Sequence, residues 1–499
     1  MNVKKENISY WTKSSQFNQF PQLTQDLQTD VLIIGGGIAS ILAAYQLAKA
    51  GREVTVLEGR HLSQGTTAGT TAKITAQHHL LYQNFIKQRS EEEARLYYEA
   101  QTDGINVIRN LADEYNIDCD METLSSIQVT IGESEKKIRK EYEAYQKLGI
   151  NGDLHEKDMG LPFETTMGLE MYDQAQFHPL KFLAGMVEVC VDLGVTFFEE
   201  TMVKKIDGNT VETESGQEVS FNQLICATHY PIVNIKHNLL FHLEIERSYI
   251  VAVKDHTPIP YAMFQVADIP ERSLRHYITE DGLGLLVGGE NHVTGAKDDV
   301  EVGYERLAYD AKALFNVDHI EDKWSAQDMM TADKMPLIGR YSKNDDRIFV
   351  ITGFNKFGMA TAGVGSLVLR DLLMGQSNKY EELLKPSRID TLSSQIKATA
   401  KKAFSAIKGQ TKAVKDYRTD RDALHTDEAG IFLTDGKFEA VYKDDEGTEH
   451  AVSPFCTHMG CVLSFNNGEK TWDCACHGSR FDCDGKVLHG PASTDLTQQ

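Results

Sequence analysis

The last 44 residues of the chain hold the feature that most constrains its fold. They contain a Cys-x-His arm at Cys456 and His458 and, after 15 intervening residues, a Cys-x-x-His arm at Cys474 and His477. Two thiolates and two imidazoles are the donor set of a [2Fe–2S] cluster in which one iron takes cysteines and the other takes histidines. The segment therefore predicts a small domain built around an iron–sulfur cluster.

A structural zinc site and a disulfide knot are the other interpretations of this segment. Zinc also accepts two cysteines and two histidines. Its usual spacing, however, groups cysteine with cysteine and histidine with histidine, whereas each arm here mixes the two. The pattern therefore favours the cluster.

Arm for arm, and with Gly490-Pro491 following the second arm, the segment resembles Rieske [2Fe–2S] domains. The resemblance implies that one iron is bound by two cysteines and the other by two histidines, namely Cys456 with Cys474 and His458 with His477.

The same resemblance implies roles for four neighbouring residues. Cys461 and Cys476 match the pair that forms a disulfide between the two cluster loops, and Ser479 matches a hydroxyl that hydrogen-bonds a cluster sulfur. Phe481 stands where the family has a tyrosine, so one further hydrogen bond is expected to be missing. Fewer hydrogen bonds to the cluster lower its reduction potential, and we expect a value below those of the respiratory members.

A second motif lies near the start of the chain, at Asp30 to Ser40. An apolar strand leads into Gly35-Gly36-Gly37 and then into a helix, and the next strand ends at Glu58. This is the dinucleotide-binding pattern in its βαβ context, although Ser40 replaces the usual third Gly or Ala. The helix N-terminus would bind the pyrophosphate, and Glu58 would accept a hydrogen bond from a ribose hydroxyl.

Further segments resemble FAD-dependent oxidoreductases of the D-amino-acid oxidase and sarcosine oxidase group. They are the Asp-x-x-Pro-x-x-Gly motif from Asp333 to Gly339 and the Gly-Phe-x-x-x-Gly motif from Gly353 to Gly358. The resemblance implies an α/β FAD-binding domain of Rossmann type with an α+β substrate domain, followed by an all-β Rieske domain. The residues expected to contact FAD are Gly35, Gly37, Ser40, Glu58, Thr70, Thr71, Lys73, Ala227, Thr228, Gly339, Gly353, Phe354, Lys356, Phe357, Gly358 and Met359.

Two departures from the group bear on substrate and cofactor. Residues 325–332 contain no cysteine, so we expect noncovalent FAD. Ala360 stands where sarcosine oxidases have a substrate-binding lysine. Candidates for the substrate side of the flavin are therefore other polar residues, namely Arg247, Tyr249, Lys356, His178 and Lys334.

The expected domain organisation follows from these motifs. Residues 1–29 form an arm anchored by Trp11, Phe17 and Phe20, and residues 30–380 form the oxidoreductase. Within it, the FAD-binding parts are 30–80, 180–235 and 325–380, and the substrate-domain parts are 81–179 and 236–324. Alternating apolar residues predict sheet strands at 241–253 and 276–287. Residues 381–424 form a basic helical linker, and residues 425–499 form the Rieske domain.

Charge and hydropathy limit the partners. The net charge of −22 argues against nucleic acid, which needs clustered positive charge. No secretory signal or membrane span is visible, so a cytoplasmic location is expected. Apolar residues recur at helical spacing in the basic linker, from Ile389 to Val414. This pattern predicts a helix packed on the flavin domain or, alternatively, resting on a membrane surface.

The two motifs together predict a dehydrogenase. FAD accepts an electron pair as a hydride and the cluster carries one electron, so an amine or amino-acid-like substrate would reduce FAD and the cluster would pass electrons singly to an external carrier. Three alternatives remain open: electron flow from cluster to flavin, direct use of O₂ by the flavin, and a non-enzymatic redox sensor. NAD(P)H is not expected as a co-substrate, because a second dinucleotide fingerprint is absent.

Overall fold

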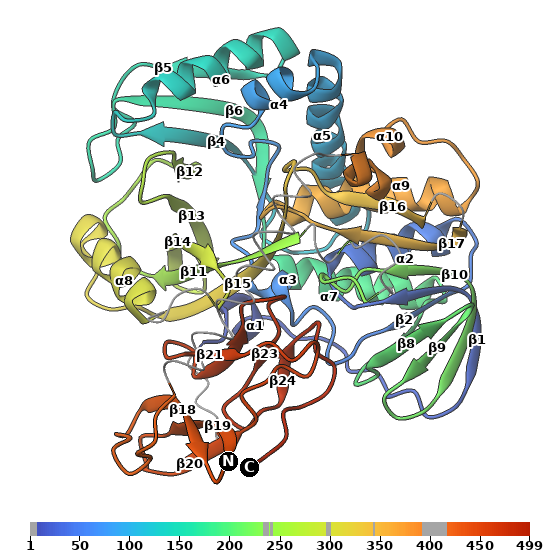
Figure 1. Ribbon diagram of the computed structural model, residues 1–499. Coiled ribbons are helices and arrows are strands. Elements are labelled where there is room, and N and C mark those ends of the chain that lie inside the picture. Colours follow the sequence, from blue (N-terminus) through green and yellow to red (C-terminus); the bar gives the residue numbers. More distant parts are fainter. Residues whose placement is uncertain (1–6, 233–238, 240–242, 296–300, 343–344, 392–416) are drawn as a thin grey trace.

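A computed structural model describes residues 7–232, 239, 243–295, 301–342, 345–391 and 417–499. Within these ranges the chain forms a helix-covered mostly parallel sheet, a large second sheet, and a small β-rich C-terminal part that lies against both (Figure 1).

The first sheet has eight strands in the order β16-β17-β10-β1-β2-β7, with the β8–β9 hairpin attached to β10. The pairs β1–β10, β1–β2, β10–β17 and β2–β7 are parallel. The central strands are almost fully buried, as expected for a parallel sheet covered by helices. The strands are β1 (Leu27–Ile34), β2 (Val54–Leu57), β7 (Thr196–Phe198), β8 (Val203–Asp207), β9 (Thr210–Thr213), β10 (Glu218–Cys226), β16 (Leu337–Ser342) and β17 (Asp345–Thr352).

Helices α2 (Ile38–Lys49), α7 (Pro179–Asp192) and α9 (Gly358–Leu373) pack together beside this sheet, and α5 (Glu91–Glu114) packs on α9. Alanines and glycines let α2 and α9 approach closely, and both helices are mostly buried. The short helices are α1 (Tyr10–Lys13), α3 (Thr66–Gly69), α10 (Glu381–Leu384) and the 3₁₀ helix η2 (Pro386–Thr391).

The second sheet has nine strands in the order β15-β11-β14-β13-β12-β4-β6-β3, with β5 attached to β6. Helix α8 (Glu301–Phe315) packs on β11 and β14, whereas α4 (Tyr82–Gln88) and α6 (Glu135–Leu148) lie near β5 and β6 (Figure 1). The strands are β3 (Lys73–Ile74), β4 (Glu122–Thr130), β5 (Gly152–His155), β6 (Met167–Gln176), β11 (Leu243–Val253), β12 (Met263–Val266), β13 (Arg272–Thr279), β14 (Gly282–Val293) and β15 (Asp322–Thr331).

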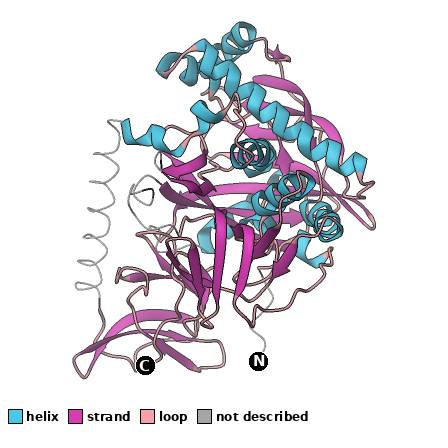
Figure 2. Ribbon diagram, turned by 90° about the vertical axis from the view of Figure 1, so that its right-hand side faces the viewer, coloured by secondary structure: helices cyan, strands magenta, loops and turns pink. Residues whose placement is uncertain are grey.

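The C-terminal part consists of two small antiparallel sheets. The first contains β18 (Glu428–Thr434), β19 (Lys437–Lys443) and β20 (Glu449–Val452). The second contains β21 (Leu463–Asn466), β22 (Thr471–Cys474), β23 (Arg480–Phe481) and β24 (Val487–His489). The second of these sheets is the one nearer the two large sheets (Figure 1). Figure 2 shows the C-terminus at the lower edge of the molecule.

The structure differs from three of the expectations drawn from the sequence. Residues 276–287 are not one strand, because the hairpin between β13 and β14 turns at residues 280–281. The strand β15 belongs to the second sheet, although residues 325–331 were expected in the FAD-binding part. In the linker expected at 381–424, Glu381–Leu384 form an α-helix, Pro386–Thr391 form a 3₁₀ helix, 417–424 are not helical, and 392–416 lie outside the described residues.

The N-terminal arm is anchored as its aromatic residues suggested. Trp11 is buried, and its indole N–H donates to the Thr70 carbonyl over 2.8 Å. Among the described residues, no helix is both long and apolar enough to cross a membrane.

Candidate active site

The glycine turn after β1 approaches its neighbours too closely for side chains. A Cβ on Gly35, whose φ is +105°, would lie 2.6 Å from the Ala227 carbonyl oxygen, and one on Gly36 would lie 2.5 Å from Leu62. Helix α2 then begins with Gly37 as its N-cap, which makes no side-chain cap hydrogen bond. The turn and the first residues of α2 line a cavity of about 340 Å³. Thr67 Oγ1 accepts from the Ile38 N–H over 3.3 Å, and the remaining helix N-terminus in this position suits a pyrophosphate.

Glu58 lies at the end of β2 and also lines the cavity. One carboxylate oxygen accepts from the Gly36 N–H over 2.6 Å, and the other accepts from the Arg60 N–H over 2.9 Å. Burial raises the pKa of Glu58. Each oxygen keeps acceptor capacity for a further donor such as a ribose hydroxyl.

A second helix N-terminus reaches the same cavity. Helix α9 begins at Gly358 without a side-chain cap, and Phe354, Phe357 and Met359 beside it line the cavity. Two helix N-termini at one cavity are suited to a ligand that carries negative charge in two places.

Most of the residues expected to contact the nucleotide do line this cavity, but three do not. Ser40 is buried inside α2. Gly339 packs toward Leu372 and Pro386, and Gly353 is a turn glycine (φ +72°) whose Cβ would lie 2.6 Å from Thr331. The residues in the wall are Gly35, Gly37, Glu58, Thr70, Thr71, Lys73, Ala227, Thr228, Phe354, Lys356, Phe357, Gly358 and Met359.

Three buried polar atoms of cavity-lining residues have no hydrogen-bond partner among the described residues. They are His229 Nε2, Tyr230 Oη and Tyr249 Oη. Leaving a buried polar group unpaired costs about 1–3 kcal/mol. These atoms therefore fit a cavity that is completed by a polar ligand such as a flavin nucleotide.

Two lysines line the cavity, one in an ion pair with a carboxylate and the other with a lowered pKa. Lys356 Nζ is paired with Glu246 Oε2 at 2.8 Å, and Asp328, which lies opposite Glu246 on β15, has its pKa raised to about 6 by burial. Lys73 Nζ donates to the Phe264 carbonyl over 2.7 Å, and burial lowers its pKa to about 7. Sequence reasoning missed Asp328, because no local pattern marks a single acidic residue on a strand.

The structure removes three candidates from the substrate side. His178 is the N-cap of α7, where its side chain accepts from the Lys181 N–H. Lys334 is exposed in a turn. Arg247 does not line the cavity; it is 1% exposed and pairs with Glu469 of the C-terminal part over 3.0 Å. Tyr249 and Lys356 do line the cavity.

The cysteine and histidine arms form two matching loops, one after β20 and one after β22. In each loop a glycine N–H donates to the carbonyl of the first cysteine over 2.8 Å, Gly460 to Cys456 and Gly478 to Cys474. A disulfide between Cys461 and Cys476 joins the loops.

The four expected ligands converge between these loops. The imidazole rings of His458 and His477 are 5.0 Å apart and nearly perpendicular. A hydrogen bond with Cys474 lowers the pKa of the Cys456 thiol to about 6, and one with Ser479 acts in the same direction. His458 Nδ1 is buried without a partner among the described residues. Two thiols and two imidazoles held together fit a [2Fe–2S] cluster.

The C-terminal part closes one side of the cavity. Val487, His489 and residues 490–493 belong to its wall. The second cysteine loop is pressed against the second sheet, because a Cβ on Gly478 would lie 2.8 Å from Ile245 and the Gly478 carbonyl accepts from Gln327 Nε2 over 3.0 Å. The two candidate sites are therefore neighbours.

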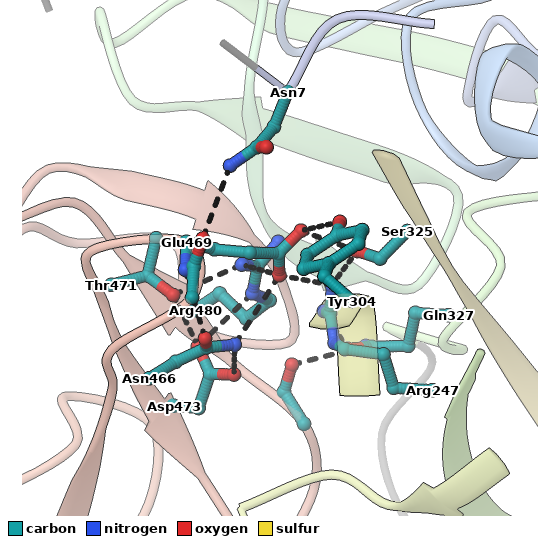
Figure 3. A network of polar contacts seen from close by, with 12 residues as sticks. Asn7, Arg247, Tyr304, Ser325, Gln327, Asn466, Glu469, Thr471, Asp473 and Arg480 are labelled. Atoms are coloured by element: carbon teal, nitrogen blue, oxygen red, sulfur yellow. Dashed lines mark hydrogen bonds and ion pairs between the residues drawn. The ribbon is translucent and has the colours of Figure 1, made fainter. Parts of the chain in front are cut away.

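A buried charge network holds this contact (Figure 3). Glu469 pairs with Arg247 at 3.0 Å and with Arg480 at 2.6 Å, and it accepts from Ser325 over 2.6 Å. Arg480 also pairs with Asp473 at 3.0 Å. Sequence reasoning missed this network, because Arg247 and Glu469 are 222 residues apart.

Comparison with known proteins is consistent with this geometry. The family model described as FAD dependent oxidoreductase matches residues 30–372, and the Rieske [2Fe-2S] domain model matches residues 416–498. The Rieske 2Fe-2S iron-sulfur protein YhfW of Bacillus subtilis is 37% identical, with 99% of this chain and 98% of that protein covered.

More distant likenesses concern the oxidoreductase part. The gamma-glutamylputrescine oxidoreductase of Escherichia coli is 21% identical over 74% of this chain and 90% of its own length. The crystal structure of L-proline dehydrogenase from P. horikoshii has a TM-score of 0.60 at 20% identity, covering 73% of this chain and 98% of that one. The latter likeness concerns the fold alone.

Proposed function

Because the chain belongs to the FAD dependent oxidoreductase family, ends in a Rieske [2Fe-2S] domain and so binds FAD and a [2Fe–2S] cluster, we propose that it is an amine or amino-acid dehydrogenase. FAD supplies a two-electron hydride acceptor, and the cluster supplies a one-electron carrier. The direction we propose is from substrate through the flavin domain to the Rieske domain and then to an external one-electron carrier.

The residues proposed to hold the two groups follow from the geometry. Gly35, Gly37 and the N-terminus of α2 would bind the pyrophosphate, and Glu58 the ribose. The N-terminus of α9 would stabilise negative charge on the flavin ring. In the Rieske domain, Cys456 and Cys474 would bind one iron, and His458 and His477 the other.

One observation carries the proposal: the Rieske domain supplies part of the cavity wall. Residues 487 and 489–493 line the same space as the glycine turn and the N-terminus of α9. A domain that only tethered or stabilised the oxidoreductase would not need to supply residues to the wall of the flavin site. Direct contact between the two sites supports electron exchange within one chain.

The substrate class is supported by the relatives and by the wall residues. A relative of the oxidoreductase part is named for gamma-glutamylputrescine, which is an amine. On the substrate side we propose Lys356 and Tyr249, and we withdraw Arg247, since Glu469 neutralises it. Lys356, Glu246 and Asp328 together form a mixed-charge group suited to a substrate that carries an ammonium group.

The test is anaerobic mixing of the holoprotein with N-methylated amines, D- and L-amino acids and cyclic imino acids. Absorbance would follow bleaching of the flavin, and electron paramagnetic resonance (EPR) would follow the reduced cluster. The expected result is a compound that bleaches the flavin first and then produces the reduced Rieske signal. If every compound left both centres oxidised while dithionite reduced both, the dehydrogenase proposal would be wrong.

A further inference from the structure

Tyr230 occupies the space between the cavity and the two histidines of the Rieske domain. Its ring is 2% exposed, and its residue lines the cavity. The ring centroid lies 6.3 Å from that of His458 and 6.0 Å from that of His477, with both imidazoles edge-on to it. One side chain of the flavin domain therefore contacts both imidazoles.

The backbone around Tyr230 is held in an unusual conformation. His229 has a φ of +63°, which is uncommon for a residue other than glycine. Hydrogen bonds fix it: the Tyr230 N–H donates to the Thr228 carbonyl, Thr228 Oγ1 donates to the Tyr230 carbonyl, and Thr352 Oγ1 donates to the His229 carbonyl. Strained backbone of this kind persists where the surrounding structure requires a particular side-chain position.

The hydroxyl of Tyr230 is a second feature of this side chain. It is buried and has no partner among the described residues, although such an atom costs about 1–3 kcal/mol when unpaired. A phenylalanine would fill the same space without that cost. The hydroxyl is accounted for if a polar group from outside the chain lies next to it.

We propose that Tyr230 is the bridging side chain through which electrons cross from the flavin cavity to the histidine side of the cluster, an inference that rests on the proposed function. Oxidation of a substrate H–C–N–H unit to C=N releases two electrons and two protons. The protons go to solvent, and the two electrons cross the Tyr230 contact one at a time. The cluster, held by Cys456, Cys474, His458 and His477, would accept one electron at a time, and an oxidised one-electron carrier would take up each electron in turn.

The test compares Tyr230→Leu, which removes the aromatic ring, with Tyr230→Phe, which keeps it, in the full-length holoprotein. The flavin is photoreduced anaerobically, and appearance of the reduced cluster is followed by rapid-freeze EPR. The expected result is that Tyr230→Leu slows the transfer by an order of magnitude or more, whereas Tyr230→Phe transfers at a rate close to that of the wild type. Tyr277→Leu is the matched control, because Tyr277 is also buried with an unpaired hydroxyl but packs on Tyr10.

Equilibrium titration separates a bridge from a merely structural residue. The reduction potentials of both centres should be unchanged in Tyr230→Leu, so that only the rate differs. Transfer at the wild-type rate in a Tyr230→Leu protein that retains both cofactors would overturn the bridging role. Should this variant lose a cofactor, Tyr230→Met, which keeps more side-chain volume without a ring, serves in its place. A wild-type protein that shows no internal transfer would refute the proposed function instead.

Discussion

At the residue scale, Phe481 sets the hydrogen bonding around the cluster loops. It is fully buried on β23 and packs in the same apolar cluster as Cys456 and Cys474. A phenyl ring there excludes water without donating a hydrogen bond. The cluster environment is thus less polar than it would be with a tyrosine.

Phe481→Tyr is predicted to raise the reduction potential of the cluster. A hydroxyl that donates to a ligand sulfur stabilises the reduced, more negative cluster. A differential hydrogen bond of about 1 kcal/mol corresponds to roughly 40 mV for a one-electron couple. Redox titration followed by circular dichroism measures the shift. Phe465→Tyr, on β21, adds the same hydroxyl outside the loops and should leave the potential unchanged; an equal shift in both variants would contradict this explanation.

Lys73 predicts a pH dependence of stability in the flavin-free protein. Burial lowers its pKa from 10.5 to about 7, so between these values the unfolded chain binds more protons than the folded one. Stability therefore rises with pH across this window. Lys73→Met should remove this rise. The difference in unfolding free energy between the variant and the wild type should therefore favour the variant more at pH 7 than near pH 10. Denaturant unfolding at several pH values checks this, and parallel pH profiles for the two proteins would refute it.

At the element scale, the crossing of α5 and α9 places the N-terminus of α9 at the cavity. The helices touch through glycines: a Cβ on Gly104 would lie 1.9 Å from the Ala360 carbonyl oxygen, and one on Gly363 would lie 2.3 Å from the Gly104 carbonyl oxygen. The two backbones are in direct contact at this point, so a clash with an added Cβ cannot be relieved by rotating a side chain.

Gly104→Ala is accordingly predicted to destabilise the protein by about 1–3 kcal/mol, the usual cost of overpacking, and to weaken FAD binding by displacing α9. Thermal unfolding and flavin titration measure the two effects. Gly303→Ala in α8 is the matched control, because its new Cβ would meet Tyr249 at an ordinary 3.4 Å and alanine favours the helix by up to about 1 kcal/mol. Equal melting temperatures for the two variants would show that the two helices can accept an added methyl group at their crossing.

Elements with local signals could be predicted from the sequence, and contacts between distant elements could not. The turn at Gly35 and the start of α9 are marked by glycines next to apolar runs, and the two cysteine loops by their spacing. The turn between β13 and β14 was missed because apolar residues lie on both sides of it, Tyr277 and Ile278 before and Leu283 after, which hid Glu280 and Asp281 within one long pattern. Tyr230 has no local signal, since the rings beside it, His458 and His477, are more than 200 residues further along the chain.

At the scale of the whole molecule, the Rieske domain is docked through buried charges. Burial raises the pKa of Glu469, but the charges of Arg480 and Arg247 outweigh burial and hold it below its usual range. The contribution of ionised Glu469 to the free energy of docking is therefore fully present above the ordinary carboxyl pKa of about 4.3. It is lost as the pH falls through the lower pKa that Glu469 has in the folded protein.

Glu469→Gln is predicted to loosen the docked domain, because Arg247 would remain buried without its counter-charge. Removing one partner of a buried pair costs about 3–5 kcal/mol. Small-angle scattering should show that the variant is more extended than the wild type at neutral pH. The wild type should become similarly extended only under acid conditions. Glu446→Gln alters an exposed carboxylate of the same domain and should change neither property. A compact Glu469→Gln protein at neutral pH would mean that other contacts suffice for docking.

The shared cavity wall has a consequence for how this protein can change over evolutionary time. Since residues 487 and 489–493 complete a chamber built mostly by the other domain, neither half can be exchanged for a homologue without reshaping the other. A gene rearrangement that separated the two coding regions would leave an oxidoreductase with an open side. Substitutions on the two sides of this wall are therefore expected to occur in compensating pairs.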